Sequence, residues 1–204
     1  MKTGLTGPPA LEWAVASRAL PGETESGDAY LVRSSAVGTL VAVVDGLGHG
    51  CEAAAAARAA VRALEAATIQ SVADAIRHCH STIAKTRGAA VSIVFFEASD
   101  YTLTWLGVGN VQGVLVSGQR DGTRPREHLF LRGGVVGFRL PSLRPSKLPV
   151  VPGDTLILAT DGIDGDFVQD SPLDDPPARI AERILARHHK VTDDALVLVA
   201  RHVG

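Results

Sequence analysis

Short runs of apolar residues recur along the chain, and turn-forming glycine, proline, aspartate and serine residues separate them. Runs of this length and character are typical of buried β-strands. The segments predicted as strands are residues 13–18, 29–33, 40–45, 90–97, 102–107, 111–116, 128–131, 154–161 and 195–202. Because short turns separate the central runs, the pattern favours antiparallel pairing of neighbouring strands.

Three segments have helical patterns instead. Residues 53–67 consist almost entirely of alanine and other strong helix formers. Residues 71–87 place apolar side chains at helical spacing, and residues 178–189 form the last predicted helix. Residues 133–152 and 164–177 are rich in glycine, proline or acidic residues and are predicted as loops. Strand clusters with helices between and after them indicate an α+β domain in which helices cover sheets.

The chain has 204 residues, of which 46% are hydrophobic, and this length suits one domain over residues 1–204. Its formal net charge of -2 gives no basic field for nucleic acid or an anionic membrane. The first residues lack the apolar stretch of a secretory signal, and no run approaches the ~20 apolar residues that cross a bilayer. Cys51 and Cys79 fall in helical patterns, where we expect buried or weakly reactive thiols rather than a disulfide. A cytoplasmic monomer, with no nucleic-acid or membrane partner, is the expectation.

Acidic residues lie at the ends of four predicted strands. Asp45 and Asp161 each end an apolar run, and glycine follows each of them at once. Asp193 and Asp194 immediately precede the last strand, and Asp28 precedes an early one. A single Asp-Gly pair is most often a turn, but the recurrence of apolar run, acid and glycine indicates a functional site.

Carboxylates gathered at one end of a sheet would repel one another and lose water, so cations would be needed to neutralise them. Hard divalent ions with oxygen ligands and several waters, such as Mg²⁺ or Mn²⁺, suit this set. No cluster of cysteine and histidine at ligand spacing supports a structural zinc site. Glycine after a ligand leaves room for close approach, including coordination by its carbonyl.

Four motifs in order along the chain carry a resemblance to a known family. They are ESGD at 25–28, VVDGLGHG at 43–50, ATDG at 159–162 and TDD at 192–194. Together they resemble the metal-dependent protein phosphatases of type 2C, and the DGLGHG form resembles their SpoIIE-like bacterial branch. With GVGN at 107–110 and GGVVGFRLP at 133–141, the chain is most similar to the RsbX-type phosphatases of the stressosome.

This resemblance implies an αββα four-layer sandwich, in which two packed antiparallel sheets carry a pair of helices on each outer face. It also implies a centre of two divalent metal ions, Mn²⁺ or Mg²⁺, at one end of the sandwich. By the match, Asp45 would bridge both ions, Gly46 would offer its carbonyl, and Asp28 would bind the second ion directly or through water. The residues matched to metal ligands are Asp28, Asp45, Gly46, Asp161, Asp193 and, ranked below Asp193 because it is the neighbour of a ligand, Asp194.

The implied activity is hydrolysis of phosphoserine or phosphothreonine by a water held between two ions about 3.5 to 4 Å apart, without a covalent phosphoenzyme. Asp45 is therefore a catalytic candidate. His49 is the second, since a histidine near a metal centre can protonate the leaving oxygen; its alternative role is to pack the loop at the helix start. Leu196 replaces a threonine that often follows the last ligand. Arg18 is a candidate phosphate contact only by its place in the sequence.

The resemblance to RsbX-type enzymes implies phosphorylated STAS-domain proteins of the stressosome as substrates. Other SpoIIE-like phosphatases act on anti-sigma-factor antagonists, and that alternative stays open, as does a non-catalytic module that binds a phosphoprotein. The glycines at 46–50 and 107–109 do not form nucleotide sites, because no Lys-Ser or Lys-Thr follows the first and a third glycine is missing from the second. The loop 164–177 is a candidate specificity element.

Overall fold

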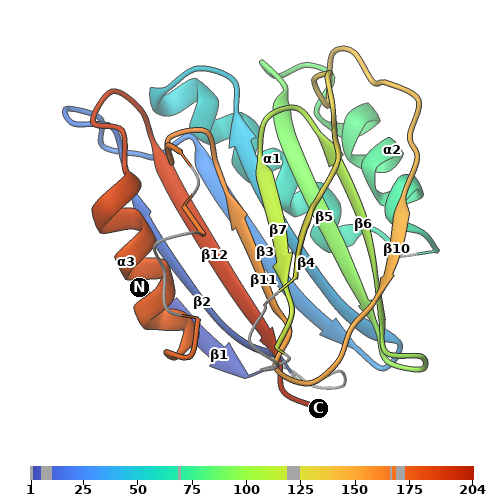
Figure 1. The fold of residues 1–204 in the computed structure, drawn as a ribbon. Helices are drawn as coiled ribbons and strands as arrows, with labels where there is room; N and C mark the ends of the chain where they lie inside the picture. Colours follow the sequence, from blue (N-terminus) through green and yellow to red (C-terminus); the bar gives the residue numbers. More distant parts are fainter. Residues whose placement is uncertain (1, 6–10, 69, 119–124, 166, 169–172) are drawn as a thin grey trace.

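Two β-sheets packed face to face form the centre of the fold (Figure 1). The computed structural model describes residues 2–5, 11–68, 70–118, 125–165, 167–168 and 173–204. The first sheet has the order β1 (Lys2–Leu5), β2 (Leu11–Arg18), β12 (Ala195–His202), β11 (Thr155–Ala159), β7 (Gln112–Val116) and β8 (Arg126–His128). The second has the order β10 (Ser146–Pro149), β6 (Thr102–Val108), β5 (Ala89–Glu97), β4 (Gly38–Gly46) and β3 (Asp28–Ser35). Neighbours in both orders are antiparallel, and β9 (Leu131–Arg132) joins β6 in parallel.

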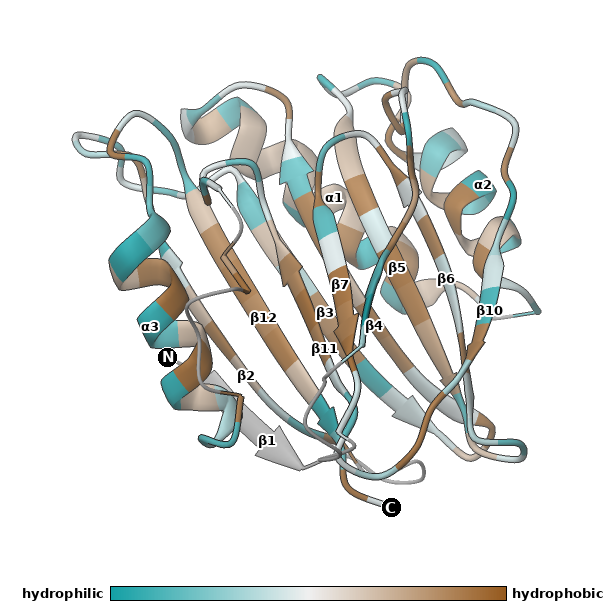
Figure 2. Cartoon of the chain, viewed as in Figure 1, coloured by the Kyte–Doolittle hydropathy of each residue, from teal (hydrophilic) through white to brown (hydrophobic). Residues whose placement is uncertain are grey.

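Helices cover the outer faces of both sheets (Figure 1). α1 (Gly50–Ala66) and α2 (Val72–Thr82) pack on the second sheet, and α3 (Pro177–His188) packs on the first. Strand residues alternate between these outer layers and a central layer that includes Phe96 and Trp105, so apolar side chains line the strands (Figure 2). None of these three helices has the length and apolar character required to cross a membrane.

The layered sandwich of two antiparallel sheets is confirmed, with one difference in its helices. Where a pair was expected outside the first sheet, α3 is the one helix that the described residues place there. Phe167, Val168 and Leu173, from the segment before α3, fill the same apolar layer.

Most predicted strands exist, but two segments differ from the prediction. Residues 133–152 were expected to form a loop, yet they contain β10, a short edge strand that pairs with β6. Residues 128–131 were expected to form one strand, but they divide between β8 on the first sheet and β9 on the second. The second predicted helix ends at Thr82 rather than at residue 87, and Gly88 has a φ of 83°.

The strand registers bring particular strand ends together. β3 begins and β4 ends at one edge of the second sheet, where Asp28 lies opposite Asp45. In the first sheet the end of β11 lies beside the start of β12, with Ala159 opposite Val197. A hydrogen bond from the Thr160 hydroxyl to Asp28 joins these two edges, so both sheets contribute to one end of the sandwich.

Candidate metal centre

The acidic strand ends meet around a cavity of about 260 Å³. Asp45 lines the cavity from the end of β4. Asp161 lines it from the second position after β11, and Asp193 lines it from the turn before β12. The remaining lining residues are Leu47, Gly48, His49, Ala90, Asn110 and Thr192. Asp28 lies next to Asp45 in the sheet register and lines the neighbouring groove. The structure therefore gathers the acidic residues of four strand ends from both sheets.

A buried hydrogen-bond chain holds Asp28 in place. The backbone N–H of Leu196 donates to the Thr160 hydroxyl oxygen over 2.9 Å, and that hydroxyl donates to Asp28 Oδ2 over 2.7 Å. The chain crosses from the first sheet to the second. It therefore fixes the distance between the two halves of the site.

Asn110 connects the other carboxylates. Its side-chain amide donates to Asp161 Oδ2 over 2.6 Å, and the same side chain lowers the pKa of Asp45. On the opposite side of Asp161, Lys190 Nζ donates to the Asp161 backbone oxygen over 2.7 Å. These contacts orient Asp161, and the charge of Lys190 offsets only part of the repulsion in the cluster, because the pKa of Asp193 is still raised.

The electrostatics of the cluster favour a cation. Burial, followed by repulsion from Asp161 and Asp193, raises the pKa of Asp45 to about 7, against the lowering effect of the Asn110 side chain. Burial and the charge of Asp45 raise the pKa of Asp28 well above its usual range. The pKa of Asp193 is raised by burial and by Asp161. Three carboxyl groups are thus costly to ionise unless a positive charge joins them.

This donor set fits a hard divalent ion. Every candidate side chain offers carboxylate oxygen, which Mg²⁺ and Mn²⁺ prefer. Across the described ranges, no three Asp, Glu, His or Cys side chains stand close enough together to hold an ion unaided.

The glycines after Asp45 and Asp161 allow backbone segments to approach closely. A Cβ on Gly46 would lie 2.2 Å from the carbonyl oxygen of Ala53 in α1, and one on Gly162 would lie 1.8 Å from the carbonyl oxygen of Asp194. Each glycine is buried. Helix α1 therefore packs directly on the Asp45-Gly46 pair, and the turn before β12 packs directly on the Asp161-Gly162 pair.

Asp194 has a different position from its neighbour Asp193. Its side chain is 4% exposed, and its two oxygens accept the backbone N–H groups of Leu20 and Gly27, each over 2.8 Å. It does not line the cavity. Asp194 thus holds the loop that leads into Asp28, and Asp193 is the better ligand candidate.

His49 lies at the rim of the cavity as the N-cap residue of α1. Its Nδ1 lies 2.8 Å from Glu23 Oε1, and its side chain is 63% exposed. Glu23 belongs to the loop that Asp194 holds. The contact orients the imidazole at the rim of the cavity.

Sequence reasoning missed three residues that organise the site, Thr160, Asn110 and Lys190. Thr160 lies within the motif ATDG and Asn110 ends the motif GVGN, but neither was given a role. The signal that could have found them is a polar side chain inside a motif that borders a strand end. Arg18 does not line the cavity. Successive residues of a strand point to opposite faces of the sheet. Ser17 lines the groove beside Asp28, so the next residue, Arg18, points to the opposite face of β2, which packs on α3.

Comparisons with known proteins agree with this geometry. A family model for stage II sporulation protein E (SpoIIE) matches residues 35–203. No curated protein matches the chain.

Solved structures resemble the chain over nearly its whole length. One, from work on the bacterial stressosome as a modular system adapted to control secondary messenger signalling, is 27% identical, with a TM-score of 0.84 over 94% of this chain and 99% of that one. RsbX in complex with magnesium is 18% identical, with a TM-score of 0.82 over 98% and 99%. The catalytic domain of the serine/threonine protein phosphatase PstP, with two manganese ions, is 20% identical, with a TM-score of 0.70 over 95% and 99%. The chain belongs to the SpoIIE family and has the fold of the type 2C protein phosphatases.

Proposed function

We propose that the protein is a metal-dependent serine/threonine protein phosphatase. The observation that carries the proposal is the meeting of Asp45, Asp161 and Asp193 around one cavity, beside Asp28. Family membership and the fold support the same reaction class. Two divalent ions, Mn²⁺ or Mg²⁺, would be held by these carboxylates and by the carbonyl of Gly46.

Bound divalent ions supply Lewis-acid stabilisation of phosphoryl oxygens and lower the pKa of a water. The chain's own residues prepare the site for that chemistry. Asn110 orients Asp161, and Thr160 holds Asp28. His49, which contacts Glu23 at the rim of the cavity, would give a proton to the leaving serine or threonine oxygen.

The proposed substrates are phosphorylated STAS-domain proteins of a stressosome. Two structural relatives support this choice, one described in the context of the bacterial stressosome and the other being RsbX. A SpoIIE-like phosphatase acting on an anti-sigma-factor antagonist is the alternative within the same reaction class, and the family match to SpoIIE favours it. A non-catalytic phosphoprotein-binding module is disfavoured, because all four principal acids are present: Asp45, Asp161 and Asp193 line one cavity, and Asp28 lies beside Asp45.

The test is phosphate release from a phosphorylated STAS-domain protein by the full chain, with Mn²⁺, with Mg²⁺ and with chelator. We expect metal-dependent release that is lost in Asp45→Asn and kept in Asp100→Asn. Asp100 is a matched control because it is an exposed surface aspartate paired with Lys147. Release from a phosphorylated anti-sigma-factor antagonist but not from the STAS scaffold would select the alternative substrate. Metal-independent release, or full activity of Asp45→Asn, would refute the proposed reaction.

A further inference from the structure

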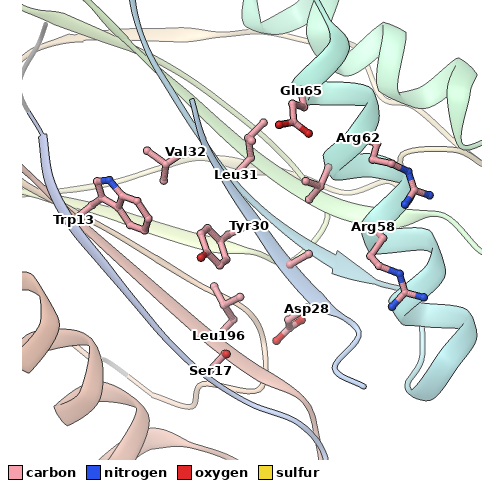
Figure 3. A pocket seen from close by; sticks show the side chains of 12 residues that line it. Trp13, Ser17, Asp28, Tyr30, Leu31, Val32, Arg58, Arg62, Glu65 and Leu196 are labelled. Atoms are coloured by element: carbon pink, nitrogen blue, oxygen red, sulfur yellow. The ribbon is translucent and has the colours of Figure 1, made fainter. Parts of the chain in front are cut away.

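The two sheets are offset sideways, and the offset leaves one strand position open. β3 is the last strand of the second sheet and contacts β12 of the first. The first sheet continues beyond β12 with β2 and β1. Among the described strands, none lies beside β3 opposite the inner face of β2. A groove of about 590 Å³ occupies that place (Figure 3).

The groove has a floor, a roof and a free strand edge. Trp13 and Ser17 of β2, with Leu196 of β12, form the floor, and α1 forms the roof (Figure 3). Between them runs β3, which pairs with β4 on one side only. Peptide groups along the other side of β3 are available to a further strand, as at other open sheet edges.

The roof carries positive charge near the acidic centre. Arg58 and Arg62 of α1 line the groove, and Glu65, which also lines it, follows farther along the helix (Figure 3). Arg58 is 2.8 Å from Glu25, with both side chains about half exposed. Arg62 makes no ion pair with any residue of the described ranges. An occupant with acidic side chains toward α1 would complement Arg62, since opposite charges across an interface favour binding.

The groove also leads to the metal centre. Asp28, the first residue of β3, lines one end of the groove and lies opposite Asp45 in the sheet. From Asp28, β3 runs along the groove toward Ser35. A strand added antiparallel to β3 would therefore run toward the metal centre, with its C-terminal end at Asp28.

We propose that a segment of the phosphoprotein substrate, directly N-terminal to the phosphorylated residue, binds in this groove as an antiparallel strand on the free edge of β3. This docking role rests on the proposed function. About six residues span the edge, at roughly 3.4 Å each. Their side chains alternate, apolar toward Trp13 and Tyr30 and acidic toward Arg62. The site thus selects phosphorylated residues that follow an extended, alternating apolar and acidic segment.

Binding of an unphosphorylated peptide tests the groove without requiring catalysis. The probe is a fluorescein-labelled peptide of alternating valine and glutamate, titrated with the full chain in Mg²⁺ and followed by anisotropy. A valine and lysine peptide and a peptide with valines and glutamates in separate blocks are the comparisons. We expect the alternating acidic peptide to bind at least tenfold more tightly than either.

Variants of the groove locate the binding. Arg62→Glu should reverse the preference, so that the lysine peptide binds more tightly than the glutamate peptide. Ser17→Phe, at an exposed position on the floor, should fill the groove and weaken binding at least fivefold. Arg179→Glu is the matched control, because Arg179 is exposed on α3 over the other sheet.

Two results would overturn the docking proposal. One is equal affinity for the three peptides, or affinity that Arg62→Glu and Ser17→Phe leave unchanged. The other is a dimer in sedimentation that Arg62→Glu dissociates, because a second copy would then be the occupant. Since binding is measured without turnover, phosphatase activity with no peptide preference would refute the docking alone. Peptide binding without phosphatase activity would refute the proposed function alone.

Discussion

Removing the charge of Asp45 should stabilise the metal-free protein. Asp45 is largely buried at the end of β4, close to Asp161 and Asp193, and its pKa is raised from 3.8 to about 7. Each pKa unit corresponds to about 1.4 kcal/mol, so ionising this carboxyl costs the folded state about 4 kcal/mol at pH 8. In Asp45→Asn that cost disappears, while the side chain keeps its size and can still hydrogen-bond.

The sign of the pH dependence follows from the direction of the shift. Between about pH 4 and pH 7 the folded state keeps a proton on Asp45 that the unfolded chain has released. The free energy of unfolding of the wild type therefore falls as pH rises through this window and levels off above it. The advantage of Asp45→Asn over the wild type should grow over the same range.

Urea denaturation in chelator at pH 5, 6, 7 and 8 measures this difference. Excess Mn²⁺ at pH 8 should reverse the order, because ions that bind only the folded wild type stabilise it. Asp100→Asn, at the exposed surface, serves as the control and should show no such growth with pH. A variant less stable than the wild type in chelator at pH 8, or a difference that does not change with pH, would refute the electrostatic reasoning.

Three further substitutions test the contacts around the centre. Asn110→Ala removes the amide that orients Asp161, so Mn²⁺ affinity measured by calorimetry should fall about 10- to 100-fold; unchanged affinity would contradict the positioning role. Asp194→Ala leaves two backbone N–H groups without their acceptor and should lower the free energy of unfolding by about 3 kcal/mol in urea. Gly162→Ala would push against a carbonyl oxygen 1.8 Å from the new Cβ and should cost about 3 kcal/mol or more. Gly133→Ala, with nothing within 4 Å, should stay within about 0.5 kcal/mol of the wild type, and equal losses in both glycine variants would contradict the close-approach argument.

The sequence predicts the features of this site that depend on local pattern. Asp45 and Asp161 stand out because each ends an apolar run and precedes glycine, and the structure gathers both at one cavity. The roles of Thr160 and Asn110 depend on contacts across 132 and 51 residues of chain. Such contacts arise from the packing of two sheets, and no spacing rule along one chain contains them.

The missed elements have local explanations as well. β10 contains Lys147 and Pro149 and forms an edge strand, which needs few of the apolar residues that mark a buried strand. The segment 128–131 has a strand-like composition, but Phe130 within it is 71% exposed while Leu129 is buried. Its residues divide between two sheets, so a single strand could not be inferred from alternation alone.

The crossing from β8 to β9 makes the two sides of the sandwich unequal. Residues 126–132 pass from the first sheet to the second, with Leu129 buried between them. On this side a short covalent connection limits how far the sheets can separate. On the opposite side, β3 has no strand neighbour beyond β4 among the described elements. Local opening should therefore begin at β3, and its backbone amides should exchange with solvent deuterium sooner than those of β5, at the centre of the same sheet.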